Sequence, residues 1–255
     1  MTWGTLLEDL TAEWAELDGW LDDVDLDTPT PAEGWTIRDQ LAHLAFYDER
    51  ETVALTDPER FRTELAALLE SGGLADFADI HRGRPEVGGD DRLRTWLRVA
   101  RAEMVAAFGA HDPKDRIPWY GPDMSARSGA TARLMETWAH AQDVADALGI
   151  ERIPTNRLRH VAHLGVSTFG WSHINRGETP PRSPVRVELT GPEGDTWSWH
   201  TDGEGLVTGP ALDFCLLVTQ RRPRSELALT AEGAAAEHWL DIAQAFAGPP
   251  TDGRG

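Results

Sequence analysis

The sequence predicts a helical bundle followed by an α+β part, with an all-helical domain over residues 1–152 and a smaller α+β domain over residues 153–255. Apolar residues recur at three-to-four spacing through most of the first part, which is typical of amphipathic helices. Gly149 then ends the last of these patterns, as glycine often does at a helix C-terminus. From Ser183 onward, alternating apolar and polar residues indicate strands.

The helices of the first part are expected where the apolar stripe is regular. Thr36 and Asp39 have the spacing of a capping box, so the second helix should begin there. The stretch 111–129 is rich in Pro and Gly and is predicted to be a long loop. Together these patterns predict helices over residues 2–24, from about 35, and over 58–81, 91–108 and 130–148.

The second part mixes the two kinds of pattern. Residues 155–175 are expected to be helical. The glycines and proline of 191–194 are typical of a hairpin turn. Strands are predicted over residues 185–191, 196–202 and 227–231, and further helices over 210–220 and 231–246.

Composition and charge exclude several classes of protein. Of the 255 residues, 40% are hydrophobic and 26% charged, as in ordinary globular proteins. The formal net charge of −19 disfavours binding to nucleic acid and to anionic membranes. Neither a membrane span nor a signal peptide is evident, so we expect a cytoplasmic protein. The single cysteine, Cys215, lies in an apolar run and is expected to be a buried, inert thiol.

Three residues are candidate metal ligands. Glu136 and His140 are four apart on a predicted helix, so their side chains share one face, and His43 is a polar residue in another apolar helix. Two imidazoles and a carboxylate suit Zn²⁺, with Fe, Ni, Co and Mn left open. Spacing alone favours a capped or solvated polar face instead. Asp143 and Asp48 are each either an acceptor that orients a ligand imidazole or a surface charge.

The remaining candidates come from the long loop and from other histidines. Trp119, Tyr120, Ser125 and Arg127 precede or begin the helix of Glu136, and they either line a ligand pocket or form a packed connector. His160 and His163 are three apart on a predicted helix, and we expect both to be structural. None of the histidines other than His43 and His140 has a partner at ligand-like spacing: His81, His111, His160, His163, His173, His200 and His238.

Two longer segments resemble a known family. WTIRDQLAHLAFYDE and METWAHAQDVADALG are similar to the signatures of the DinB-like, mycothiol-dependent maleylpyruvate isomerase family. VTGPALDFCLLVTQRR and WLDIAQAFAGPP resemble a subgroup described as metal-binding proteins, whose C-terminal part has been likened to a wyosine-base-formation domain. The resemblance implies a four-helix DinB-like bundle whose metal is bound by His43, Glu136 and His140.

The family resemblance also implies a reaction. Several members use mycothiol as a cosubstrate, and members include isomerases and S-transferases. The resemblance therefore implies a metal-dependent thiol enzyme that acts on a small electrophile. An arginine of the C-terminal domain is implicated in the isomerase branch, and Arg221 or Arg222 holds that position. Either one could bind a substrate carboxylate, or it could be an ordinary cation at a helix end.

Other functions stay open. One alternative is a thiol-independent metal enzyme with hydrolase, lyase or cyclase chemistry, and another is a non-enzymatic metal-binding module. The expected partners are a small-molecule substrate and a thiol, and the sequence leaves a homodimer open.

Overall fold

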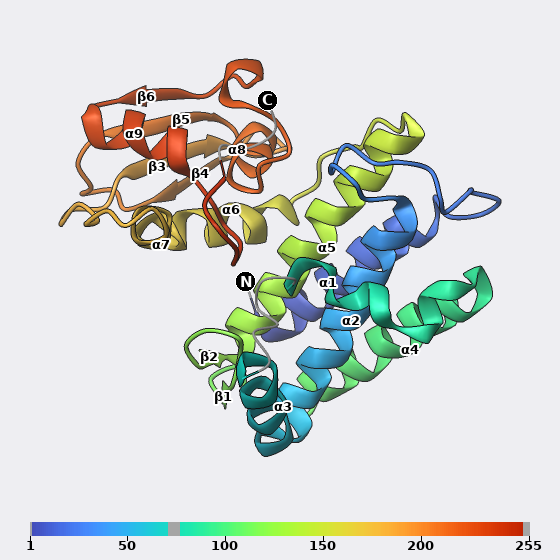
Figure 1. The fold of residues 1–255 in the computed structure, drawn as a ribbon. Coiled ribbons are helices and arrows are strands. Elements are labelled where there is room, and N and C mark those ends of the chain that lie inside the picture. Colours follow the sequence, from blue (N-terminus) through green and yellow to red (C-terminus); the bar gives the residue numbers. More distant parts are fainter. Residues whose placement is uncertain (1, 71–76, 252–255) are drawn as a thin grey trace. The chain divides into compact units, whose positions relative to one another are not determined.

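The structure is a computed structural model that describes residues 2–70 and 77–251. It consists of two units, Met1–Glu151 and Arg152–Gly255. Helices build the first unit, and a sheet with helices builds the second (Figure 1). The predicted fold class, a helical bundle followed by an α+β part, is therefore confirmed. Within the described residues, no helix is long and apolar enough to cross a membrane.

A four-helix bundle forms the described part of unit 1. Its helices are α1 (Trp3–Asp18), α2 (Ile37–Thr56), α4 (Asp90–Gly109) and α5 (Ala126–Leu148). The shorter elements are α3 (Pro58–Glu70), η1 (Phe77–Gly83), η2 (Pro85–Gly88), β1 (Arg116–Ile117) and β2 (Met124–Ser125). Helix α2 packs against α4 and α5, and α1 packs against α5. The core between them is built from fully buried apolar residues that include Leu10, Leu17, Leu41, Leu44, Phe108 and Leu134.

Local signals set most helix ends of unit 1. The capping box of Thr36 and Asp39 is present at the start of α2, and Gly149 follows α5 with a φ of 65°. Helix α1 ends at Asp18 rather than near residue 24, because Gly19 and the aspartates after it disfavour a helix. Helix α5 begins four residues before its predicted start, because the Ser125 hydroxyl caps it by accepting from the backbone N–H of Ser128 at 3.1 Å.

Two other segments of unit 1 differ in detail from their predicted form. The predicted loop 111–129 contains a short hairpin, in which β1 pairs antiparallel with β2. The helices predicted over 58–81 are α3 and η1, and residues 71–76 of that stretch lie outside the described residues.

A four-stranded sheet is the centre of unit 2. Its strands are β3 (Arg186–Thr190), β4 (Thr196–Trp199), β5 (Leu206–Pro210) and β6 (Thr230–Glu232), in the order β4-β3-β5-β6. Strands β3 and β5 are parallel, and the other pairs are antiparallel. The other elements are α6 (Leu158–Ser167), α7 (Phe169–Asn175), α8 (Ala211–Val218), η3 (Arg224–Glu226) and α9 (Ala234–Ile242). Helix α8 packs on β3 and β5, α6 packs on α8, and α7 packs on α9.

Strand β5 lies outside the predicted strands. It contains Gly209 and Pro210, which are typical of turns rather than of strand interiors. A Cβ at Gly209 would lie 2.5 Å from the carbonyl oxygen of Ala228, so only glycine permits this close approach of the chain after α8.

Charged side chains are buried between α2 and α5. Oδ1 of Asp48 accepts from Nε and Nη2 of Arg133 at 3.0 and 2.9 Å, and the two side chains are 0% and 3% exposed. Nη2 of Arg133 also donates to the carbonyl of Leu44 at 3.3 Å. Burial raises the pKa of Asp48, while Arg133 opposes the rise. The pair joins the two helices, and loss of one partner would leave a buried, uncompensated charge.

A second buried carboxyl group lies one turn further along α2. Burial raises the pKa of Glu51 to about 8, with Asp48 adding to the rise and Arg133 opposing it. This carboxyl is therefore mostly neutral at pH 7. It faces Gly129 of α5, where an added Cβ would clash with Oε1 of Glu51 and lie 3.2 Å from Cδ1 of Ile117. Glycine at this position lets the two helices approach.

We predict that Gly129→Ala destabilises the protein by about 1–3 kcal/mol, the usual cost of overpacking a core. At an exposed helical position the same change stabilises by up to about 1 kcal/mol. The matched control is Gly4→Ala in α1, where no atom of the described residues, apart from the local helix backbone, lies within 4 Å of the added Cβ. Urea unfolding measures both variants. The cost should shrink in a Glu51→Ala background, and an equal cost in both backgrounds would contradict the proposed clash.

We predict a pH-dependent effect of Glu51→Gln. The folded-state pKa of Glu51, about 8, lies above the ordinary glutamate value of 4.5. The protonated carboxyl of Glu51 therefore makes its full contribution to the free energy of unfolding below pH 4.5. This contribution is lost as the pH rises through 8. A difference of one bound proton between the folded and unfolded states changes the free energy of unfolding by at most about 1.4 kcal/mol per pH unit. Between about pH 5.5 and pH 7.5, the stability of Glu51→Gln should therefore rise by roughly 2 kcal/mol relative to that of the wild type. Urea unfolding at both pH values tests this, with exposed Glu8→Gln as the control; a constant difference would contradict it.

Candidate metal centre

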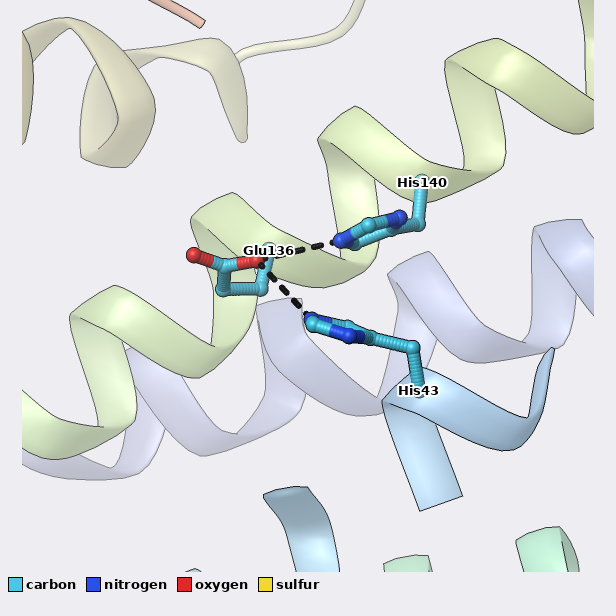
Figure 2. Close-up of side chains that lie close together, drawn as sticks. All are labelled: His43, Glu136 and His140. Atoms are coloured by element: carbon cyan, nitrogen blue, oxygen red, sulfur yellow. Dashed lines mark hydrogen bonds and ion pairs between the residues drawn. The ribbon is translucent and has the colours of Figure 1, made fainter. Parts of the chain in front are cut away.

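His43, Glu136 and His140 converge between α2 and α5, as Figure 2 shows. Nε2 of His140 lies 3.2 Å from Oε2 of Glu136, and Nε2 of His43 lies 3.9 Å from the same oxygen. One nitrogen or oxygen of each residue lies within 4.8 Å of the others. The side chains are 13%, 23% and 10% exposed for His43, Glu136 and His140. The cluster is thus mostly enclosed, and Glu136 is its most accessible member.

Helical spacing and helix packing explain the convergence. Glu136 and His140 are four residues apart on α5, so both point from one face of that helix. His43 comes from α2, which packs against α5. The capped start of α2 and the buried ion pair of Asp48 and Arg133 hold His43 opposite the α5 residues.

A chain of hydrogen bonds orients the ring of His140. The Thr30 hydroxyl donates to the carbonyl of Trp35 at 2.9 Å, so its oxygen is left to accept from Nε2 of Gln40, also at 2.9 Å. This arrangement turns Oε1 of Gln40 toward Nδ1 of His140, at 2.5 Å. Because an amide oxygen only accepts, Nδ1 of His140 carries the proton.

The protonation of Nδ1 has a consequence on the other side of the ring. Nε2 of a neutral His140 presents its lone pair, and this lone pair faces the carboxylate oxygen of Glu136 at 3.2 Å. Two acceptors at this distance repel each other unless a proton or a cation lies between them. Two imidazole nitrogens and a carboxylate oxygen are also the ligands that Zn²⁺ uses in three-ligand sites. The residues present therefore fit a divalent metal.

Aromatic rings surround the cluster. The ring centroid of Trp35 lies 5.2 Å from that of His43 and 5.9 Å from that of His140, nearly parallel to the latter. The ring centroid of Tyr47 lies 4.6 Å from that of His43. Burial raises the pKa of the Tyr47 phenol, so the phenol is protonated at neutral pH. The side chain of His81 is fully buried. Its ring centroid lies 5.1 Å from that of Trp35 and 5.7 Å from that of His43.

Several of these neighbours were not among the predicted site residues. Gln40 precedes His43 by three residues on the same helix face, so helical spacing could have indicated it. Trp35 lies in the family-like motif, but nothing in the sequence assigns it to this cluster. His81 belongs to η1, and only the tertiary structure brings it beside the ring of His43.

The predicted acidic neighbours are both buried. Asp143 follows His140 by three residues on α5 and is 1% exposed, so it is not a surface charge. Asp48 was open to the same two interpretations, and its burial against Arg133 makes it part of the contact between α2 and α5.

The predicted loop residues fall into two groups. Trp119 and Tyr120 pack near Tyr47, with ring centroids 6.4 and 6.0 Å away, so one aromatic ring separates them from His43. Ser125 caps α5, and the guanidinium of Arg127 lies 5.8 Å from the ring of Trp3. Both belong to the start of α5, and Arg127 precedes Glu136 by nine residues, or about 14 Å along the helix axis.

A small cavity lies beside this aromatic group. Its volume is about 160 Å³, and it is lined by Phe46, Arg50, Phe61, Glu64, Leu65, Leu68, Ile80 and Tyr120. The ring of Phe61 stacks on that of Trp119 at 5.7 Å. The loop before α5 is therefore packed into unit 1 and still borders open space through Tyr120.

Arg221 and Arg222 belong to unit 2, where they follow α8. Nη1 of Arg221 donates to the carbonyl of Thr219 at 2.6 Å, and Nη1 of Arg222 donates to the carbonyl of Arg221 at 2.8 Å. Both guanidinium groups thus contact backbone carbonyls at the end of the helix. A role in substrate binding stays a prediction.

Known proteins resemble this chain along nearly its whole length. Residues 7–145 match the family model of the mycothiol maleylpyruvate isomerase N-terminal domain. Two uncharacterized proteins of Mycobacterium tuberculosis, from strains H37Rv and CDC 1551 / Oshkosh, are each 47% identical over 98% of both chains. The likeness of the C-terminal part to a wyosine-base-formation domain is not tested by these comparisons and stays a prediction.

Solved structures agree at the level of the fold. The crystal structure of the mycothiol-dependent maleylpyruvate isomerase matches with a TM-score of 0.55, and a histidine-to-alanine mutant of it matches with 0.56. Each match covers 91% of this chain and 93% of the other, at 16% sequence identity. With the family match over more than half of the residues, these findings assign the protein: the chain belongs to the mycothiol maleylpyruvate isomerase N-terminal domain family.

Proposed function

We propose that this protein is a metal-dependent enzyme that uses a low-molecular-weight thiol, mycothiol, as cosubstrate. The proposed reaction is an S-transfer to, or an isomerisation of, a small electrophilic substrate. Membership of the family and the fold shared with the mycothiol-dependent maleylpyruvate isomerase support the thiol and the isomerase chemistry. The observation that carries the metal is the convergence of the three side chains, in which the Thr30–Gln40 chain turns Nε2 of His140 toward the Glu136 carboxylate.

The proposed ligands are His43, Glu136 and His140, and Zn²⁺ is the metal that best suits them. A divalent cation held by three protein ligands has an open position, and it lowers the pKa of a thiol that reaches it. Because Nδ1 of His140 contacts Gln40, Nε2 is the nitrogen of that ring left to bind a metal. The partial exposure of Glu136 leaves one side of the cluster accessible.

The residues around the cluster would control what reacts there. The rings of Trp35 and Tyr47 pack against the imidazole of His43, and we propose that they limit the access of water to it. The protonated phenol of Tyr47 could donate a hydrogen bond to a carbonyl or carboxylate of the substrate. We propose that Trp119 and Tyr120 border the substrate on the far side of Tyr47. Asp143 is buried one turn beyond His140 and is proposed to support that part of α5.

The two reactions share their first step. The thiolate sulfur adds to an electrophilic carbon, forming a C–S bond. In an isomerase the thiolate adds to a double bond conjugated with a carbonyl, and the displaced electron pair moves onto the carbonyl oxygen. The resulting single bond rotates, and return of the electron pair expels the same thiolate and restores the double bond. In a transferase the C–S bond is kept, and either a leaving group departs with its bonding electron pair or the adduct takes up a proton. We propose Arg221 or Arg222 as the cation that binds a substrate carboxylate bidentately.

We predict that His43→Ala and His140→Ala each bind one metal equivalent fewer than the wild-type chain, because each removes an imidazole ligand. Elemental analysis of the purified protein measures the metal. His111→Ala is the matched control, since His111 lies at the end of α4 and bonds to the carbonyl of Ala107. Wild-type metal content in both ligand variants would refute the assignment of the site.

We predict that mycothiol changes the visible spectrum of the Co²⁺-substituted protein, because a thiolate that joins the ion adds a sulfur-to-metal charge-transfer band. S-methyl mycothiol is the matched control, since it has no thiol to ionise. His43→Ala should lose the response. If the Co²⁺ spectrum depends on His43 but does not respond to mycothiol, the protein is a thiol-independent metal protein and the thiol proposal is wrong.

We predict that Gln40→Leu lowers metal affinity by about 10- to 100-fold, the usual effect of removing a partner that orients a ligand imidazole. Gln40→Glu keeps an acceptor for Nδ1 of His140 and should retain the affinity. Gln142→Leu is the control, because this amide bonds to Asp146 elsewhere on α5. Competition with a chromogenic chelator measures all three. Equal affinity in Gln40→Leu and wild type would show that the Thr30–Gln40 chain does not tune the site.

A further inference from the structure

A second group of two histidines and one carboxylate lies in unit 2. Nδ1 of His173 and Nε2 of His238 both contact Oε2 of Glu178, at 2.9 and 2.8 Å. The three atoms lie within 4.8 Å of one another. We propose that His173, Glu178 and His238 bind a divalent metal ion of the Zn²⁺ class, in addition to the candidate metal centre of unit 1.

The end of helix α7 brings the first two ligands together. The backbone N–H of Glu178 donates to the carbonyl of His173, and that of Gly177 donates to the carbonyl of Ile174, both at 2.9 Å. Gly177 has a φ of 73°. These two hydrogen bonds and the left-handed glycine form a Schellman motif, which folds the chain back over the last turn of the helix. Glu178 therefore reaches a side chain five residues earlier, which continued helical geometry would not allow.

Helix α9 supplies the third ligand. It packs on α7, and the ring centroids of His173 and His238 are 5.5 Å apart. The exposed fraction of the side chain is 3% for His173, 37% for Glu178 and 48% for His238, so His173 lies in the core and the other two lie near the surface. One ligand is thus fixed by the core, while the other two leave a path for an ion to enter and for water to complete its coordination.

The position of His173 selects the nitrogen that would bind. Its ring packs against Phe169, with centroids 5.0 Å apart. Nε2 is buried and, among the residues that the structure describes, has no hydrogen-bond partner. Nδ1 is consequently the nitrogen that faces Glu178. A metal bound there would have Nδ1 of His173, Oε2 of Glu178 and Nε2 of His238 as its protein ligands.

Both imidazole nitrogens are placed around one carboxylate oxygen, which is the arrangement that a shared cation would use. Both imidazoles converge on one oxygen of Glu178, although the carboxylate has two. Zn²⁺ binds nitrogen and oxygen ligands at about 2.0–2.1 Å, which puts two ligands of a tetrahedral ion about 3.3 Å apart. The observed separations of 2.8 and 2.9 Å need only small side-chain shifts to reach this geometry. The rival interpretation is a hydrogen-bonded link between α7 and α9 that involves a protonated histidine.

The test isolates the second site. In the His43→Ala/His140→Ala double variant, the unit 1 ligands are gone, and the protein is stripped of metal with a chelator before Co²⁺ titration. We expect the visible absorption of one bound equivalent. Adding His238→Ala should lower the affinity by about 100-fold or more, because a ligand is lost rather than an outer partner. His200→Asn is the control, since His200 is exposed in unit 2 and Asn tolerates its φ of 51°.

Two results would overturn the proposal. One is the absence of saturable Co²⁺ binding in the double variant, and the other is unchanged binding after His238→Ala; either would leave the hydrogen-bonded link as the explanation. If the double variant does not fold, the Zn²⁺ content of the wild-type protein is compared with that of the single variant His238→Ala. Two equivalents in wild type and one in His238→Ala support the site, and equal contents refute it. None of these results depends on mycothiol, so the thiol proposal stands or fails separately.

Discussion

The contact between α2 and α5 is the interaction on which the rest of unit 1 depends. The buried pair of Asp48 and Arg133 links the two helices, and Gly129 lets them approach beside the neutral carboxyl of Glu51. One candidate ligand comes from α2 and two come from α5. The same contact therefore sets both the stability of the bundle and the separation of its candidate ligands. A change in that contact would shift the candidate ligands relative to one another, even where none of them is replaced.

The polar groups of unit 1 form connected layers rather than isolated charges. Beside the ion pair, the Thr30 hydroxyl and the Gln40 amide each donate one hydrogen bond and accept another, and Nδ1 of His140 donates to that amide. This polarity runs from a backbone carbonyl to the edge of the cluster, where Nε2 of His140 faces Glu136. Such a chain has a cost in a buried place unless every member is satisfied, so a proton or a cation is needed at its end.

The two His–Glu–His groups are built by different means. In unit 1, regular helical spacing places Glu136 and His140 on one face, and helix packing adds His43. In unit 2, the end of a helix brings the ligands together, because the left-handed Gly177 folds Glu178 back over His173. Helical periodicity is visible in a sequence, whereas the reversal at a helix end joins residues at a spacing that matches no regular structure. Helical spacing therefore indicated the pair of Glu136 and His140, and the family resemblance added His43, whereas neither signal pointed to the second group.

The sequence by itself determined the fold class, most helix positions, the capping box of Thr36 and Asp39, and the three residues of the unit 1 cluster. The fold class, the helices and the capping box follow from local propensity and periodicity. The family-like motifs assign His43 to the same site as Glu136 and His140 on α5. Tertiary structure decided strand β5, whose glycine and proline look like a turn until the close approach of Ala228 is known. It also decided the burial of Asp48 and Asp143, the tautomer of His140 and the meeting of His173 with His238. Each depends on side chains that lie far apart along the chain, and only packing brings such residues together.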